Sequence, residues 1–243
     1  TQGEMLHNAA GVAPSWAGIS PYYSIRGFRT RSSFRNGVNG YVASDMDPVS
    51  TAQLEVIKGP SAVIFGGGGA TMITFGGLIN RVTVKPQHTT FADISATGGS
   101  YNLQRATLDI NRPLDKDAKV LARLTGAYTY NGSFQDQGFS KTFFLAPSIS
   151  YKISDDLNIQ LDAEILNKTA TNNPLYQVAL GTAKSADELN LDYLRSFQDN
   201  TVTLNNKAVN IYGKIIYRLS ENWKSETNLI SINNKTPGDY IRL

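Results

Sequence analysis

The chain has 243 residues and no cysteine, and 18% of its residues are charged, which gives a formal net charge of +3. The absence of cysteine excludes a disulfide scaffold and thiolate metal sites, and the two histidines, His7 and His88, are too far apart for a zinc-binding spacing. The basic excess is too small to predict nucleic acid as a partner.

Residues 1–86 hold the whole charge excess, with seven basic and four acidic side chains. Four of the basic residues lie within ten positions, namely Arg26, Arg29, Arg31 and Arg35. Residues 87–243 are neutral in sum. This shift in composition predicts a domain boundary near Pro86.

A stretch of uncharged residues separates Lys58 from Arg81 and is long enough to cross a bilayer as a helix. It contains Pro60 and seven glycines, four of them in a run from Gly66. Each glycine costs a helix roughly 1 kcal/mol relative to alanine, so the stretch predicts a turn between short strands instead. Its glycines do not match a phosphate-binding motif.

From residue 90 onward the hydrophobic period is two, which predicts strands. The clearest case places Leu157, Leu161 and Ile165 on one face and Asp162 and Glu164 on the other. Seven strands are expected, over 91–98, 105–111, 120–130, 143–153, 157–165, 208–218 and 223–232. Most have about the 9–11 residues that a tilted strand needs to cross a bilayer.

The connections between these strands alternate between short polar turns and longer loops, a pattern typical of an outer-membrane barrel. Aromatic residues near the strand ends could form a girdle, and they are Tyr128, Tyr130, Phe143, Tyr151 and Tyr217. A soluble β-sandwich alternates in the same way and stays open as an alternative. Seven strands cannot close a wide barrel, so the sheet is expected to be incomplete.

The longest connection has a helix signal of its own. Ser185 and Glu188 have the spacing of a capping box, and Leu189, Tyr193 and Phe197 follow on one helical stripe. We expect a short helix over about 186–197, which either gates the lumen or packs its loop.

Three motifs occur in order in the first part of the chain. They are Tyr23-Ser-Ile-Arg-Gly-Phe28, then Leu54-Glu-Val-Ile-Lys-Gly-Pro60 with Ser61–Gly66, and finally Gly76-Gly-Leu-Ile-Asn80 leading into Arg81–Pro86. Together they resemble the plug of TonB-dependent outer-membrane receptors, with wording closest to the siderophore (ferrichrome-type) branch. Lys58 stands where the family usually has arginine, and Val84 is inserted in the last motif.

The resemblance implies a mainly β fold. It implies part of a plug domain, a small mixed α/β sheet, over residues 1–86, which we name the plug segment. About seven antiparallel strands of an incomplete transmembrane β-barrel would follow over residues 87–243. The early plug would precede Thr1, and most of roughly 22 barrel strands would follow Leu243.

The resemblance also implies site residues. Arg26 and Lys58 would be buried cations that pair with acidic groups of the barrel wall, and Glu55 would pair within the plug segment. Sharp turns and close backbone approaches are expected at Gly27, Gly59, Pro60, Gly66, Gly76 and Gly77.

Four residues near the expected plug apex are candidates for ligand binding, namely Arg29, Arg31, Ser33 and Tyr41. Guanidinium and hydroxyl groups suit the oxygen-rich, anionic surface of a ferric siderophore. As an alternative, Arg29, Arg31 and Arg35 are solvated or pair with lumen carboxylates such as Asp162 and Glu164.

The function implied is import of a ferric siderophore across the outer membrane of a Gram-negative bacterium. The partners would be outer-membrane lipid and the energising complex of TonB with ExbB and ExbD. No catalytic constellation, metal site or resident cofactor is expected, and iron enters only as cargo. The alternatives are an importer of another cargo (glycan, cobalamin or haem) and a soluble β-rich binding domain.

Overall fold

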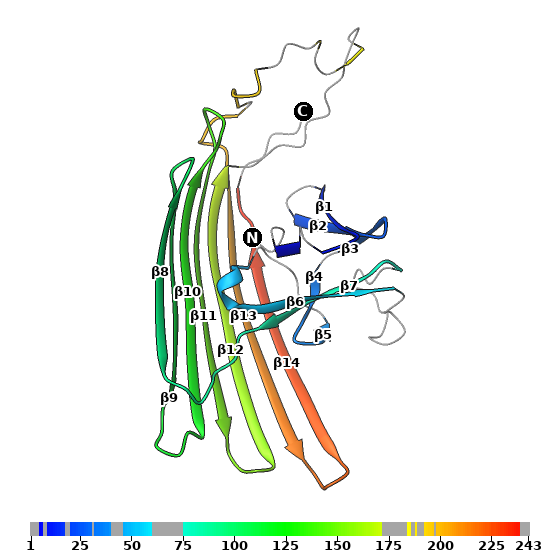
Figure 1. Ribbon diagram of the computed structural model, residues 1–243, viewed down its shortest axis with the longest axis vertical. Coiled ribbons are helices and arrows are strands. Elements are labelled where there is room, and N and C mark those ends of the chain that lie inside the picture. Colours follow the sequence, from blue (N-terminus) through cyan, green and yellow to red (C-terminus); the bar gives the residue numbers. More distant parts are fainter. Residues whose placement is uncertain are drawn as a thin grey trace.

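The computed structural model describes residues 5–6, 9–17, 20–30, 32–39, 46–59, 75–171, 184–185, 188, 192–196 and 198–238. Within these residues the chain forms three sheets. Two small sheets belong to the plug segment, and one large sheet follows it (Figure 1).

The first small sheet is antiparallel and consists of β1 (Val12–Ala17), β2 (Ser20–Ile25) and β3 (Phe28–Thr30), in that order. Arg26 and Gly27 join β2 to β3 with φ angles of 51° and 83°. Two positive φ values in a two-residue hairpin loop define a type I′ turn, whose twist matches the twist of the paired strands.

The second small sheet has the order β5-β4-β7-β6, with β4 (Ser32–Arg35), β5 (Val38–Asn39), β6 (Thr51–Lys58) and β7 (Gly77–Thr83). The pair β4–β7 is parallel, and the other pairs are antiparallel. A 3-10 helix, η1 (Pro48–Ser50), leads into β6. Asn36 and Gly37 form another turn with positive φ angles, 50° and 79°, between β4 and β5.

The large sheet, which we name the wall sheet, holds seven antiparallel strands in sequence order. They are β8 (Phe91–Gly99), β9 (Leu103–Pro113), β10 (Val120–Gly132), β11 (Phe139–Lys152), β12 (Leu157–Thr171), β13 (Thr203–Arg218) and β14 (Lys224–Lys235). The expected number of strands is confirmed, but β12 and β13 have 15 and 16 residues and exceed the expected length. Their additional residues are mostly polar, so pairing continues where the apolar alternation stops.

The two faces of the wall sheet differ as the alternation predicts. Leu161 and Ile211 are about half exposed on the outer face, whereas Glu164 and Phe144 are buried on the inner face. The inner face packs against the plug segment through a cluster of Met46, Ala127, Phe144, Leu166, Ala208 and Tyr212. A face that leaves its leucines and isoleucines exposed suits lipid as its surroundings.

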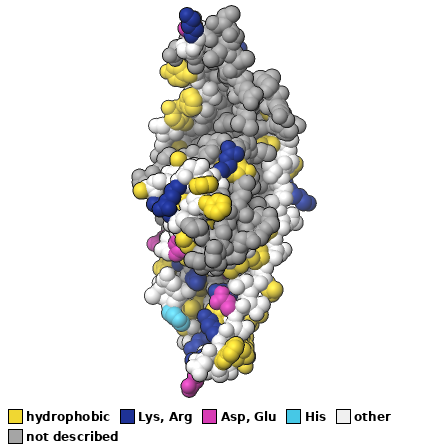
Figure 2. All heavy atoms as spheres, turned by 90° about the vertical axis from the view of Figure 1, so that its right-hand side faces the viewer, with side chains coloured by type: hydrophobic (Ala, Val, Ile, Leu, Met, Phe, Trp, Pro, Cys, Tyr) yellow, Lys and Arg dark blue, Asp and Glu magenta, His cyan; other side chains and the backbone are white. Residues whose placement is uncertain are grey.

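Figure 1 shows the wall sheet as a long, curved layer with the plug segment on its concave side. The face that the plug segment turns away from the wall sheet carries Lys and Arg side chains at mid-height of the molecule (Figure 2). None of the helices formed by the described residues is long and apolar enough to cross a membrane.

The helix expected over 186–197 lies largely outside the described residues. Tyr193 and Leu194 form a turn, and the backbone N–H of Lys184 donates to Glu188 Oε2 at 2.9 Å. In the expected capping box, Glu188 would accept the backbone N–H of Ser185, so the observed bond is shifted by one residue.

Candidate functional site

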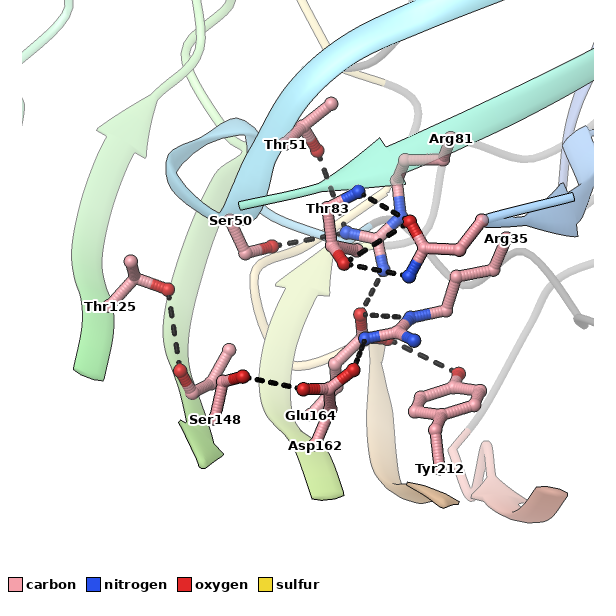
Figure 3. Close-up of polar contacts among 12 residues, drawn as sticks. Arg35, Ser50, Thr51, Arg81, Thr83, Thr125, Ser148, Asp162, Glu164 and Tyr212 are labelled. Carbon is pink, nitrogen blue, oxygen red and sulfur yellow. Dashed lines mark hydrogen bonds and ion pairs between the residues drawn. The ribbon is translucent and has the colours of Figure 1, made fainter. Parts of the chain in front are cut away.

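Four charged side chains meet where the plug segment touches the wall sheet (Figure 3). Arg35 ends β4 and Arg81 lies in β7, and the parallel register pairs these two residues side by side. Both arginines point toward Asp162 and Glu164 of β12. We name these four residues the ionic latch.

The ionic latch is almost completely buried, with relative exposures between 0% and 7% for its four residues. Arg35 Nη2 lies 3.2 Å from Asp162 Oδ2, and Arg35 Nε lies 3.0 Å from Glu164 Oε1. Arg81 Nη2 pairs with the same oxygen of Glu164. Two cations and two carboxylates make the latch neutral, which offsets the large cost of removing each charge from water.

Neighbouring side chains support the ionic latch. The guanidinium carbon of Arg35 lies 3.8 Å from the ring centroid of Tyr212, and the Tyr212 hydroxyl donates to Glu164 Oε2 at 3.3 Å. Ser148 Oγ donates to Asp162 at 2.5 Å, and Arg81 Nη1 donates to Ser50 Oγ at 3.0 Å (Figure 3). Strands β11, β12 and β13 therefore all contribute to holding the plug segment.

A second ionic contact lies at η1. Arg105 of β9 donates through both terminal nitrogens to the two carboxylate oxygens of Asp47, each at 2.7 Å. Asp47 also accepts the backbone N–H of Val49 at 2.9 Å as the N-cap of η1. Arg105 donates further to Thr129 Oγ1 at 2.6 Å. Because the two hydrogen bonds between Arg105 and Asp47 are parallel, they fix the orientation of η1 as well as its position.

The residues that join the plug segment to the wall sheet also form hydrogen bonds with that sheet. Arg123 forms a two-bond ion pair with Asp109, at 2.6 and 2.8 Å, and donates to the carbonyl of Lys85 at 3.0 Å. Gln87 and Asn111 exchange hydrogen bonds of 2.8 and 2.9 Å. The plug segment is thus held to the wall sheet at three places: the ionic latch, η1, and residues 85–87, where the chain passes into the wall sheet.

Within the described part of the chain, the side chains of Arg26 and Lys58 are exposed and are not covered by the wall sheet. Arg26 occupies the hairpin turn between β2 and β3, and Lys58 is the last residue of β6, which lies at the edge of its sheet. Glu55 accepts hydrogen bonds from Gln53 and Asn80, each at 2.7 Å, so its partners lie within the plug segment. The pairing of Arg26 and Lys58 with the wall stays a prediction.

The alternative that Arg35 pairs with Asp162 and Glu164 is confirmed. Sequence reasoning did not select Arg81 as a partner. Its signal was present, however, because Arg81 is a single cation in the otherwise uncharged strand β7. A cation in a strand with five buried neighbours requires an acidic partner from elsewhere in the chain.

The glycine positions divide into turns and close contacts. Gly27 and Gly59 have φ angles of 83° and 113°, which favour glycine. A Cβ at Gly76 would overlap the carbonyl oxygen of Ile25, and one at Gly77 would overlap that of Ile57. Pro60 and Gly66 lie outside the described residues.

The ligand-binding candidates are only partly described. Arg29 is exposed on β3, and its guanidinium carbon lies 5.1 Å from the ring centroid of Tyr22. Ser33 lies in β4, but its side chain is outside those described, as are Arg31 and Tyr41 altogether. Ligand binding by these four residues stays a prediction.

Two turns of the wall sheet hold carboxyl groups with lowered pKa values. The pKa of Asp115 is lowered mainly because its carboxylate accepts a hydrogen bond from the backbone N–H of Val120. The pKa of Asp155 is lowered mainly by a hydrogen bond from the side chain of Lys152. Among the described residues, no group of three or more acidic or histidine side chains could hold a metal ion.

Comparison with known proteins matches most of the plug segment to a known domain family. Residues 1–72 match the family model of the TonB-dependent receptor plug domain. The metal-pseudopaline receptor CntO of Pseudomonas aeruginosa is 34% identical over 120 residues, which are 49% of this chain and 16% of CntO. The ferrichrome outer membrane transporter/phage receptor of Escherichia coli is 24% identical over 98% of this chain and 33% of its own length.

Solved structures share the fold. P. aeruginosa FpvA bound to heterologous pyoverdines superposes with a TM-score of 0.80 at 18% identity, over 94% of this chain and 31% of FpvA. The ferric-catecholate import receptor Fiu of E. coli gives a TM-score of 0.76 at 21% identity, over 95% of this chain and 35% of Fiu. The chain thus spans about a third or less of the proteins it matches. These relatives are receptors and transporters, which agrees with the expectation that the chain is no enzyme.

Proposed function

We propose, for a chain whose residues 1–72 match the family model of the TonB-dependent receptor plug domain, that the receptor carrying it imports a ferric siderophore. Import would take place across the outer membrane of a Gram-negative bacterium. The relatives described above are named as receptors or transporters for ferrichrome, catecholate and pseudopaline complexes, which supports cargo of this class.

The ionic latch is the observation that carries the mechanism. A plug must stay closed without cargo and yet open when it is pulled, so its attachment to the wall needs to be strong and reversible. A buried, neutral set of ion pairs meets both needs, because removing one partner costs about 3–5 kcal/mol while no covalent bond has to break. Force transmitted through β7 would separate Arg81 from Glu164 and free the plug segment from β12.

The pulling partner would be TonB, energised by ExbB and ExbD and attached at the N-terminal end of the plug. The latch joins β4 and β7 to the wall, whereas β1–β3 form a separate sheet. Force from the N-terminal side would therefore reach β1–β3 before it reaches the latch.

Cargo would bind to the plug face that carries Arg29. Figure 1 shows the sheet β1–β3 nearer than β4–β7 to the end of the wall sheet where residues 172–202 connect β12 to β13. An exposed guanidinium on this sheet suits an anionic chelate, and Arg31, Ser33 and Tyr41 would complete the contact. Iron would enter as part of the cargo, with no resident cofactor.

Uptake of radioactive iron tests this proposal. Cells that express the full-length receptor, with or without TonB, would be supplied with ferrichrome, ferrioxamine B or a ferric catecholate. We expect uptake of at least one chelate that requires TonB, and Arg29→Gln to weaken binding of that chelate to the purified receptor. Absence of both binding and uptake for all chelates would overturn the proposal.

A second cargo is favoured by the 34% identity to the metal-pseudopaline receptor. Uptake of a metal–pseudopaline complex in the same cells, without uptake of the ferric chelates, would select it. Cobalamin, haem and a glycan serve as the remaining cargo controls. The soluble alternative is disfavoured because Leu161, Val209 and Ile211 lie exposed on the outer face of the wall sheet.

A further inference from the structure

One asparagine on the inner face of the wall sheet is buried without a hydrogen bond to its side chain. Asn210 of β13 stands directly opposite Glu164 in the register, so both side chains are on the face that meets the plug segment. Asn210 is 0% exposed, and among the described residues neither its Oδ1 nor its Nδ2 atom has a hydrogen-bond partner. Buried polar groups of this kind are rare in folded proteins, and each requires an explanation.

Other buried amides of the chain show what a structural role requires. Asn111 is also 0% exposed, and it exchanges hydrogen bonds with Gln87. Asn80 is 7% exposed and donates to Glu55 at 2.7 Å. An unsatisfied amide at Asn210 instead destabilises the structure with the plug segment in place, whereas leucine, of the same branched shape, would not. A residue that opposes its own surroundings in this way indicates a role in another state of the receptor.

Two further amides extend this feature along the wall sheet. Asn206 lies on β13 on the same face as Asn210, and Asn234 of β14 stands opposite Ala208, which lies between them. The period of two in a strand places all three amide side chains on the inner face. The side-chain oxygens of Asn206 and Asn234 are also buried, and neither has a partner within the described part of the chain. We name Asn206, Asn210 and Asn234 the amide track.

The amide track lies where the plug segment meets the wall sheet. Ala208 and Tyr212, on either side of Asn210, belong to the apolar cluster through which the inner face packs against the plug segment. Asn210 is also next to the ionic latch, because Tyr212 contacts both Arg35 and Glu164 (Figure 3). When the latch separates and the plug segment moves, the track loses this cover, and its donors and acceptors face the lumen.

Polar side chains continue on the other side of the latch. Lys214 of β13 is flanked in the register by Gln160 of β12 and Asn228 of β14. These three residues line a cavity of about 330 Å³ between the wall sheet and the plug segment. The strand from Asn206 to Lys214 is about 27 Å long. Hydrogen-bonding groups therefore follow β13 from its start, near the long connection between β12 and β13, past the latch and toward the opposite end of the sheet (Figure 1).

We propose that Asn206, Asn210 and Asn234 bind the cargo while it passes through the open receptor. The inference rests on the proposed function, which supplies a siderophore as the cargo. A carboxamide has a donor and an acceptor and no charge, so it suits the amide, hydroxamate and hydroxyl groups of a siderophore better than a bare anion. Hydrogen bonds between neutral groups are weaker than those to charged groups, and this favours brief contacts followed by release.

The test measures plug opening and cargo passage separately, in cells that express the full-length receptor. Uptake of radioactive iron from ferrichrome and from ferrioxamine B measures passage. Labelling of Ala208→Cys by a hydrophilic maleimide measures opening, because Ala208 is 1% exposed and this chain has no cysteine of its own. Any cysteine elsewhere in the receptor is replaced by serine. Asn210→Leu and the triple leucine variant of the track are compared with Asn233→Leu, whose amide is exposed on the outer face of β14 beside Asn234.

We expect each leucine to lower the ratio of uptake to opening roughly fivefold, and the triple variant to lower it on the order of 100-fold, because hydrogen bonds to the passing cargo are lost. Asn233→Leu should leave this ratio unchanged, and Asn210→Ser, which keeps a donor and an acceptor, should retain most of it. In the purified receptor, the urea midpoint of plug opening should not fall in Asn210→Leu. A merely structural role for this amide predicts a lowered midpoint instead.

An unchanged ratio of uptake to opening in the triple variant would overturn the proposal. So would a lowered urea midpoint in Asn210→Leu, or uptake that proceeds while Ala208→Cys stays unlabelled, since the cargo would then pass elsewhere. This labelling needs no variant of the track, so it stays informative if the triple variant fails to fold. TonB-dependent labelling without uptake of either chelate would overturn the proposed cargo, and with it the ligand class assigned to the amide track.

Discussion

The ionic latch makes a quantitative prediction about how the plug segment is held. Arg81 is fully buried and Glu164 is 1% exposed. Replacing Arg81 by methionine leaves the latch with an excess negative charge, and replacing Glu164 by glutamine leaves an excess positive charge. Each single substitution should lower the free energy of plug unfolding by about 3–5 kcal/mol, because an unpaired charge remains buried.

The double variant Arg81→Met, Glu164→Gln restores neutrality. We therefore expect it to lose about 2–3 kcal/mol less than the sum of the two single losses. This difference is the coupling energy of the pair, and it separates an ionic contact from two independent packing defects. A purely steric role for Arg81 would give additive losses.

The measurement is urea-induced opening of the plug in the full-length receptor in detergent. The chain has no cysteine, so Ala52→Cys on the exposed part of β6 provides a labelling site in the plug segment for a spin probe. With m-values of about 1–3 kcal/mol per molar urea, each single substitution should lower the midpoint by on the order of 1–5 M.

Lys214 and Glu226 supply the matched control cycle. They form an ion pair of 2.6 Å, but their side chains are 26% and 37% exposed. A pair this exposed should couple by no more than about 1 kcal/mol. If the coupling of Arg81 with Glu164 is no larger than that of the control pair, the latch does not hold the plug and the reasoning fails.

Three further predictions concern separate parts of the chain. Gly77→Ala should lower the urea midpoint of plug opening, because Gly77 has a φ of 139° and a Cβ there would overlap the carbonyl oxygen of Ile57. Gly213→Ala is the control: a Cβ at Gly213 meets only ordinary contacts, so the midpoint should not change. Arg105→Gln removes the pair of hydrogen bonds from Arg105 to Asp47 and should lower the free energy of plug opening by about 1–2 kcal/mol in the same assay. An unchanged midpoint would show that Arg105 does not hold the plug segment. In NMR spectra, the amide shift of Val120 should titrate with Asp115 at a pH below 3.8, because the bond from Val120 lowers that pKa. The turn is then stabilised by the carboxylate above its ordinary pKa and loses this contribution as pH falls through the lowered value, and a midpoint at or above 3.8 would contradict the bond.

Local patterns determined the larger part of the fold. Alternation of apolar and polar residues is a property of each strand alone, so it predicts the seven strands of the wall sheet and assigns Asp162 and Glu164 to the inner face. The turn at Asn36 and Gly37 has the Asn-Gly sequence that favours two successive positive φ angles, so it too follows from a local pattern. The three plug motifs, which occur in order along the chain, indicated the resemblance to TonB-dependent receptors.

The partners in the site were decided by tertiary structure. Arg35 and Arg81 are far apart in the sequence, and only the parallel pairing of β4 with β7 brings them together. Arg26 and Lys58 carry the same charge within the family motifs, yet a turn and a sheet edge leave them exposed. Which cation is buried against Glu164 depends on strand order and register, which arise from contacts between distant segments and have no local sequence signal.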